Sequence, residues 1–178
     1  MNLQPQFSQM VIPFGGLTYR KSDEEFPYRQ RPNTDVPNQH RAKIAAEVGE
    51  LKANGTRPSL SRDAQRTLGK SGARRFEEFT RYPLGWYGGR GKKLSIYSVA
   101  VFEGFVTHIP MIRERNPALF LTLDGNLSLG FSGIDETRIE LEFFPDKIEY
   151  YFESNDEEGS VGLARATELA ARIQTSLA

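Results

Sequence analysis

The stretch from Arg138 to Glu153, RIELEFFPDKIEYYFE, constrains the fold most strongly, because apolar and polar residues alternate on both sides of a Pro-Asp turn. Such alternation is the pattern of β-strands with one buried face. A two-residue loop of Pro145 and Asp146 makes the strands an antiparallel hairpin and fixes their register. Its inward-facing pairs are expected to be Phe143 with Ile148, Leu141 with Tyr150, and Ile139 with Phe152.

The opposite face of this hairpin is acidic. It is expected to carry Glu140, Glu142, Glu149, Tyr151 and Glu153. Glu142 then lies opposite Glu149, and like charges in direct cross-strand pairs are destabilising. Four glutamates could in principle hold magnesium, but such a row is more often a solvated face. We expect a basic surface of this chain or of a partner to lie across them.

A second hairpin is expected in ALFLTLDGNLSLGF, residues 118–131. A two-residue Asp-Gly loop would place the apolar faces of its strands on opposite sides. A three-residue loop with Gly125 in the left-handed conformation instead pairs Leu121 with Leu127 and Leu119 with Leu129. The second register is favoured because it gives one buried face.

An amphipathic C-terminal helix is expected to cover the sheet. Its apolar stripe consists of Leu163, Ala166, Ala170, Ile173 and Leu177. Together these elements predict an α+β domain, with a three- or four-stranded antiparallel meander packed on helices.

Charge divides the neutral chain into two halves. Residues 1–93 hold 17 Lys and Arg against 9 Asp and Glu, whereas residues 94–178 hold 6 against 14. A basic segment can meet nucleic acid, or it can dock on an acidic surface, which can belong to the same chain. We expect one compact domain with an extended arm (1–38), a basic helical region (39–93) and an acidic meander region (94–178).

The arm holds five of the ten prolines and shows neither helical nor strand periodicity. The basic region that follows it is expected to be mostly helical. Its expected helices are Arg41 to Ala53, a second from Ser61 or Arg62 with Ser59 or Ser61 as cap, and a third from Ala73 to Arg81. A further helix, capped by Ser95, is expected to run from Ile96 through Phe105 to Pro110.

The segment GWYGGRGKKLS, Gly85 to Ser95, resembles a phosphate-binding loop in composition only. A P-loop needs a glycine five residues before its second glycine, and a hydroxyl residue after the lysine. Trp86 and Lys93 occupy those two positions, so the spacing fails. A turn between two helices, with Trp86 packed into the core, is the favoured interpretation, although GGRGKK also has the composition of an Arg-Gly RNA-binding segment.

The order of these pieces resembles a group of small, largely uncharacterised bacterial proteins. They share a helix, a Gly-Trp-x-Gly turn, a Ser-capped helix, an Asp-Gly hairpin and a hairpin like LELEFFPD-IEYY, and their genes often lie near toxin, antitoxin or phage-defence genes. The resemblance covers Arg81 to Glu153. The chain departs from it at Tyr87, where an acidic residue is commoner, and at Phe131, where Trp is common. The family brings no catalytic residues with it.

Catalysis is not indicated by the remaining residues. His40 and His108 have no partners at metal-ligand spacing, and no hydrolase, metalloprotease or dinucleotide motif is present. No cofactor and no metal is therefore expected. Absence of cysteine suits a reducing compartment, and no segment is apolar enough for a signal peptide or a membrane span, so a cytoplasmic location without membrane contact is expected.

Two functions remain, and the first is favoured. It is a non-catalytic inhibitor or accessory subunit, antitoxin-like or a phage inhibitor of bacterial defence, that covers a protein partner such as a toxin or defence component. Its expected contact residues are the arm aromatics Phe14, Tyr19, Phe26 and Tyr28 and the acidic Glu140, Glu142, Glu149 and Glu153. The alternative is a nucleic-acid-binding module that uses Arg62, Arg66, Lys70, Arg74, Arg75, Arg90, Lys92 and Lys93.

Overall fold

A computed structural model describes residues 57–134 and 136–177 of this chain. The arm (1–38), with its four aromatic candidates, and the helix expected from Arg41 to Ala53 lie outside the described residues. The described part is α+β, as expected, and it is built on an antiparallel sheet in the order β1-β2-β3-β4-β5. The strands are β1 (Ala118–Leu121), β2 (Leu127–Ser132), β3 (Arg138–Phe143), β4 (Lys147–Phe152) and β5 (Glu157–Gly162).

The sheet has five strands, so the expectation of three or four was too low. The additional strand is β5, whose sequence EEGSVG holds two glycines and two glutamates, residues that are depleted in strands. It forms because a short 3-10 turn, η2 (Glu153–Asn155), and the left-handed Asp156 return the chain alongside β4. Pairing with a neighbouring strand outweighs the weak local propensity.

Both expected hairpin registers are confirmed. Leu121 pairs with Leu127 and Leu119 with Leu129 across a turn in which Gly125 has a φ of 85°. The register of β3 and β4 is set by the turn hydrogen bond from the Phe144 N–H to the Lys147 carbonyl, 2.9 Å long. Its pairs are Phe143 with Ile148, Leu141 with Tyr150, and Ile139 with Phe152.

Helix α2 (Arg62–Phe79) contains the two helical segments expected on either side of a break. Ser61 caps it, with its side chain accepting a hydrogen bond from the Ala64 N–H. Gly69 interrupts it with a φ of 68°, a conformation that glycine adopts without a Cβ penalty. The second segment therefore starts at Lys70 rather than Ala73, and it ends at Phe79, two residues before the expected Arg81.

The other helices follow the sequence pattern closely. Helix α3 (Ile96–Val106) is capped by Ser95, as expected, but it ends four residues before the expected Pro110, which instead begins the 3-10 turn η1 (Pro110–Arg115). After β5, the 3-10 turn η3 (Leu163–Arg165) leads into α4 (Ala166–Leu177). The expected stripe of α4 is buried from Ala166 to Leu177, and Leu163 packs against the core from η3.

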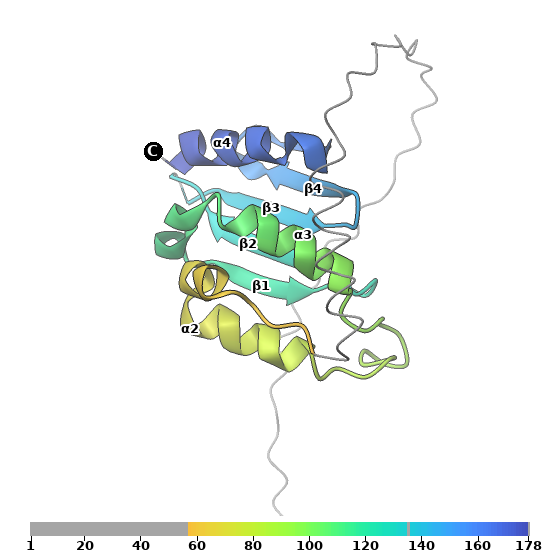
Figure 1. The fold of residues 1–178 in the computed structure, drawn as a ribbon. Coiled ribbons are helices and arrows are strands. Elements are labelled where there is room, and N and C mark those ends of the chain that lie inside the picture. Colours follow the sequence, from red (N-terminus) through yellow and green to blue (C-terminus); the bar gives the residue numbers. More distant parts are fainter. Residues whose placement is uncertain (1–56, 135, 178) are drawn as a thin grey trace, which may run out of the picture. The chain divides into compact units, whose positions relative to one another are not determined.

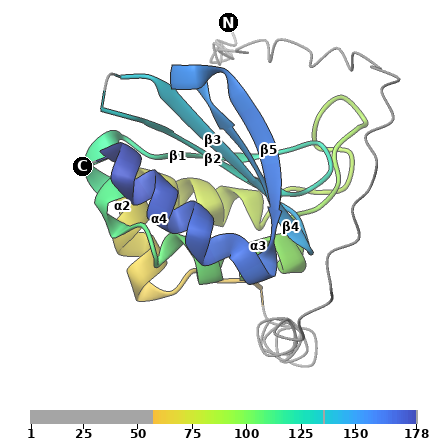
Figure 2. The same cartoon turned by 90° about the horizontal axis from the view of Figure 1, so that it is seen from above.

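The three described α-helices lie on one face of the sheet, which is called here the inner face (Figures 1 and 2). Its apolar side chains join those of the helices in one core. Phe143 is fully buried there, with its ring 5.2 Å from that of Phe102 and 5.7 Å from that of Phe105. The opposite face, the outer face, has no helix of the described residues packed on it (Figure 2).

Polar contacts fix two helices to the sheet. The buried Ser98 hydroxyl of α3 accepts a hydrogen bond from the Leu127 N–H at the start of β2. Arg172 of α4 donates two hydrogen bonds, 2.6 and 2.5 Å long, to the Glu157 carboxylate of β5. The Arg172 guanidinium also lies 4.3 Å from the ring centroid of Phe152. These contacts hold the helical layer in one position above the strands.

Candidate functional site

The outer face brings together three of the four acidic candidates. Glu140 and Glu142 of β3 and Glu149 of β4 alternate with buried apolar residues, so their side chains share this face. Glu153 lies beyond the end of β4 in η2, where it accepts a hydrogen bond from the Arg138 N–H. The candidate site is therefore the β3–β4 part of the outer face, with Glu153 at its margin.

Glu142 lies directly opposite Glu149, as the sequence predicted. Its side chain is half-buried, and it accepts hydrogen bonds from the Asn126 amide, 3.2 Å away, and from Thr122. Burial raises the pKa of Glu142 above its usual value, and the nearby Glu149 and Asp124 carboxylates add to the rise, while the two hydrogen bonds oppose it. The surroundings of Glu142 therefore disfavour the ionised form of its side chain.

Two cations of this chain neutralise the neighbours of Glu142. Lys147 is 2.5 Å from Glu149, and Arg138 is paired with Glu140. No Lys or Arg in the described residues forms an ion pair with Glu142, whose hydrogen-bond partners are neutral. Among the described residues, Glu142 is thus a half-buried carboxylate without an ion-pair partner, on a face that no described helix covers.

Sequence reasoning found the glutamates but missed their partners. Lys147 and Arg138 had a visible signal, because each lies two residues from a glutamate of the same strand and so shares its face. Asn126 had none, since its amide reaches Glu142 only through the pairing of β2 with β3.

The loop from Gly85 to Ser95 is a tight hairpin and not a phosphate cradle. The N–H groups of Gly85, Tyr87, Gly89 and Arg90 donate to carbonyl groups within the loop. Those of Lys92 and Ser95 donate to carbonyls of the β1–β2 turn, Leu123 and Gly125. These six amides are therefore engaged in bonds of the loop itself and of the neighbouring turn, and are not available to wrap a phosphate.

Trp86 is partly buried and packs against the core, which agrees with the favoured interpretation of this loop. Its indole N–H donates to the Lys92 carbonyl, 3.1 Å away, and its ring centroid lies 5.1 Å from that of Tyr82. A side chain at Gly91 would overlap the indole. Trp86 is therefore held in place by the loop rather than displayed for base stacking.

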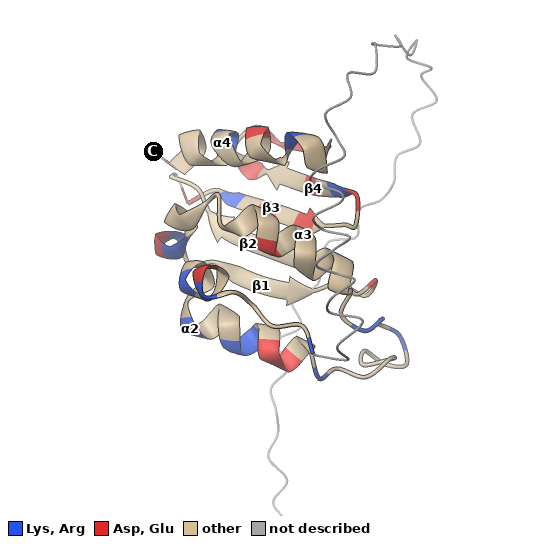
Figure 3. Cartoon of the chain, in the orientation of Figure 1, with Lys and Arg blue, Asp and Glu red and all other residues tan. Residues whose placement is uncertain are grey.

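The basic candidates of the alternative function lie on α2 and on the loop that follows it (Figure 3). Three are in ion pairs: Arg66 with Asp63, Arg74 with Glu78, and Lys92 with Asp124. The Arg75 guanidinium lies over the ring of Phe120, 5.1 Å from its centroid. Of the eight candidates, the four that form no ion pair or ring contact within the described residues are Arg62, Lys70, Arg90 and Lys93.

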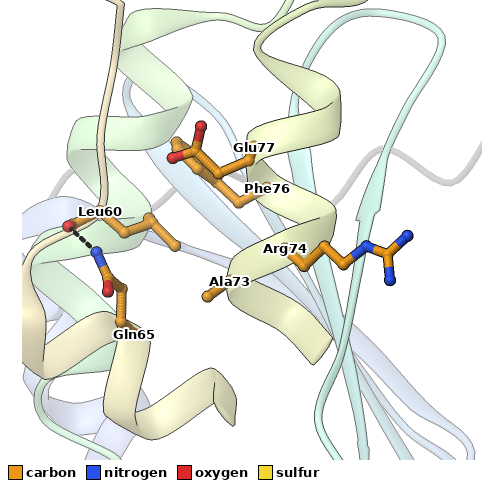
Figure 4. Close-up of a pocket in the computed structure, with 6 residues that line it drawn as sticks. All are labelled: Leu60, Gln65, Ala73, Arg74, Phe76 and Glu77. Carbon is orange, nitrogen blue, oxygen red and sulfur yellow. Dashed lines mark hydrogen bonds between the residues drawn. The ribbon is translucent and has the colours of Figure 1, made fainter. Parts of the chain in front are cut away.

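Two hollows of the described surface are small. One, of about 170 Å³, lies at the break of α2 and is lined by Leu60, Gln65, Ala73, Arg74, Phe76 and Glu77. In it the Gln65 amide donates to the Leu60 carbonyl, while Arg74 points away from its centre (Figure 4). A second, of about 290 Å³, lies between α2 and η1. Both are below the size of ordinary ligand pockets, about 300–1,000 Å³.

Other site types receive no support from the described part of the chain. No group of three or more His, Cys, Asp and Glu there is arranged to hold a metal ion. Likewise, none of its helices is long and apolar enough to cross a membrane. His108 is exposed and follows α3, and His40 lies outside the described residues.

Comparisons with models of protein families, with curated proteins and with solved structures found no match to this chain. The features of the described residues that bear on function are the outer face and the basic residues of α2 and the loop after it.

Proposed function

We propose that this protein is a non-catalytic binding protein, an inhibitor or accessory subunit that covers a protein partner with its outer sheet face. The observation that carries this proposal is Glu142, a half-buried carboxylate with a raised pKa that forms no ion pair within the part of the chain that the structure describes. A carboxylate is kept at such a position at a cost to stability, and a partner's cation removes that cost.

The partner is expected to present a Lys or Arg side chain to the Glu142–Glu149 pair. Ion pairs between partly desolvated groups are stronger than those on an exposed surface, because water screens them less. Tyr151, which lies opposite Glu140 on the same face, adds an aromatic surface of the kind enriched in binding hot spots. The outer face thus combines acidic side chains with an aromatic side chain, Tyr151.

The class of partner is proposed from the family resemblance. Proteins encoded near toxin and phage-defence genes suggest a toxin or a defence-system component, which this protein would inhibit in the manner of an antitoxin or of a phage inhibitor of defence. The aromatic residues Phe14, Tyr19, Phe26 and Tyr28 are proposed to extend the contact, since spaced aromatics suit an arm that wraps a partner.

The test begins with the full chain, tagged and expressed in its own host, and with identification of the protein that co-purifies. The affinity of that protein is then measured for the wild type and for a Glu142→Gln, Glu149→Gln variant. We expect the variant to bind at least about tenfold more weakly, because truncating a buried interfacial charge pair costs on the order of 2 kcal/mol or more.

A matched control removes the same charge elsewhere. Glu77 and Glu114 are exposed and belong to α2 and η1, away from the outer face. The Glu77→Gln, Glu114→Gln variant should bind like the wild type. Equal loss in both variants would show that net charge alone matters, and no loss in either would overturn the proposed face.

The alternative, nucleic-acid binding, is favoured by one observation: Arg62, Lys70, Arg90 and Lys93 are free of ion pairs within the described residues. Four phosphate contacts would make log Kd change by about 0.9 per contact for each tenfold rise in salt. We expect no binding to duplex or single strands tighter than about micromolar at physiological salt, the range of non-specific binding. Nanomolar binding abolished by replacing those four residues with Ala would establish the alternative instead.

A further inference from the structure

Within the described residues, β5 forms an edge of the sheet with which no further strand pairs. β5 is the last strand, and all six of its residues pair with β4 in one continuous register without a bulge. At the other end of the sheet, α2 contacts the edge strand β1. Within the described residues, β5 contains no Pro and no Lys, two of the devices that commonly protect an exposed strand edge.

The turn between β3 and β4 determines which backbone groups lie on this edge. In an antiparallel ladder, hydrogen-bonded and non-hydrogen-bonded pairs alternate, and the N–H and C=O of one residue point to the same side. Phe144 and Lys147 form the hydrogen-bonded pair at the turn. The backbone N–H and C=O groups of Ile148, Tyr150 and Phe152 therefore point away from β3 and towards β5.

Their partners on β5 are Val161, Gly159 and Glu157. The residues between them, Glu158 and Ser160, must therefore direct their N–H and C=O groups to the open edge. In the described residues none of these four groups makes a backbone hydrogen bond outside the ladder. Between Glu157 and Val161 the edge thus presents two donors and two acceptors at regular strand spacing, and Gly162 at the end of β5 faces the same edge.

We propose that the protein forms a symmetric dimer in which the β5 strands of two copies pair antiparallel about Gly159. Glu158 of each copy then exchanges two hydrogen bonds with Ser160 of the other, which uses the four edge-facing backbone groups of these two residues in each strand. The two Gly159 residues face each other at the two-fold axis as a non-bonded pair, where Cα atoms approach to about 4.5 Å.

Charge also fits a second copy of this chain. The register places each Glu158 opposite a serine, so no two like charges meet across the axis. On the inner side, the Glu157 charge is already neutralised by Arg172 and brings no unpaired charge to the contact. Identical patches that complement themselves are what a two-fold dimer, the commonest oligomer, requires.

The dimer would place both outer faces on the same side of one ten-stranded sheet. A partner with two basic sites would then be bound bivalently, which raises avidity without a new contact. Pairing through β5 does not depend on the proposed function of the outer face, because Glu158 and Ser160 pair through their backbone groups.

The test is the mass of the full chain in solution, measured by light scattering and by sedimentation equilibrium over a range of concentrations. We expect a species of twice the 20.1 kDa chain mass that dissociates on dilution. Ser160→Pro removes the edge donor without touching the ladder to β4, and it should raise the dimer dissociation constant at least about tenfold, since two bonds are lost. Circular dichroism checks that the variant is folded.

A charge pair at the same position tests the register. Ser160→Lys places a cation opposite Glu158 of the second copy and should tighten the dimer, whereas Ser160→Glu places two like-charged pairs there and should weaken it, each by about two- to tenfold. A monomer at every soluble concentration, or equal dissociation constants for the Lys and Glu variants, would overturn the proposal. Capture of a strand from another protein by this edge, without self-pairing, would also overturn it.

Discussion

The two faces of the sheet are formed by the same strands but differ in burial and in the polarity of their side chains. On the inner face, Leu129, Leu141 and Phe143 are at most 1% exposed and share a core with the helices. On the outer face, the adjacent Ser128 and Glu142 are only half-buried, and the side chains are mostly polar or charged. The inner face accounts for the fold, whereas nothing in the described fold requires the acidic pair of the outer face, which is therefore free to serve binding.

The largest expected effect separates the two faces with one residue type. Phe143→Ala empties a site in the core and should lower the free energy of unfolding by about 3–5 kcal/mol. Phe120 lies on the outer face, half-buried against Gly130 and under the Arg75 guanidinium. Phe120→Ala should cost less, about 1–2 kcal/mol, because less surface is buried there.

Urea unfolding of both variants measures the difference. Equal losses would show that the outer face is as fully covered in solution as the inner face, and the proposal of an open binding face would then fail.

The next effect concerns the turn that joins β1 to β2 beneath the glycine-rich loop. At Gly125 the backbone is left-handed, and a Cβ would overlap the Lys93 carbonyl oxygen. Gly125→Ala should therefore destabilise by about 2 kcal/mol or more, from strain and displacement of the loop. The same change at Gly104, an exposed position of α3 with open space around it, should stabilise by about 0.5–1 kcal/mol. Thermal unfolding distinguishes the two, and a tolerated change at Gly125 would contradict the close packing of loop and turn.

Much of the fold could be predicted from the sequence where one local rule decides. The Pro145-Asp146 and Gly125 turns fix register because slipping by one residue would turn an apolar set outward. Ser61 and Ser95 mark helix starts because their hydroxyls accept the first free N–H groups. Such features need no knowledge of the rest of the chain.

What could not be predicted depends on residues far apart in the sequence. β5 has poor strand propensity and forms because β4 offers an edge and Arg172 holds Glu157. Asn126 reaches Glu142 only once β2 and β3 are paired. The basic region looked like one patch, but Asp63, Glu78 and Asp124 pair with part of it.

A smaller effect should appear in acid. Hydrogen bonds from Arg172, and then from Asn155, lower the pKa of Glu157 to about 2. Because the folded pKa is lowered, this contact stabilises the protein above the usual carboxylate range, near pH 4.3, and the contribution is lost as pH falls from there towards 2. Arg172→Met keeps apolar contact with Phe152 but removes the hydrogen bonds to Glu157. Between about pH 5 and 2, roughly the window in which such a contact is lost, the melting temperature of this variant should fall less than that of the wild type.

Arg165→Met is the control for that experiment. It removes an exposed ion pair with Glu168, three residues along the chain. The dependence of its melting temperature on pH should therefore parallel that of the wild type. Parallel profiles for all three proteins would contradict the assignment of the acid-sensitive contact to Glu157.

The smallest effect on stability is the most informative about the outer face. The folded pKa of Glu142 is raised, so its ionisation opposes folding, and stability should fall as pH rises through that pKa. Glu142→Gln keeps an acceptor for the Asn126 amide and removes the charge opposite Glu149. It should stabilise the isolated protein by a few tenths of a kcal/mol at neutral pH, as relief of a like-charge pair.

The same variant should bind the partner more weakly. A change that raises stability but lowers affinity indicates that the Glu142 carboxylate serves binding rather than folding. Glu149→Gln provides the contrast, because Glu149 is already paired with Lys147. Removing the Glu149 charge leaves that lysine without its partner and does not remove a half-buried, unpaired charge. This variant should gain no stability. A Glu142→Gln protein that is both more stable and equally tight in its complex would show that the charge at Glu142 serves neither folding nor binding. Reduced stability would show that the carboxylate is stabilised within the chain, and the outer face would then need no partner to explain it.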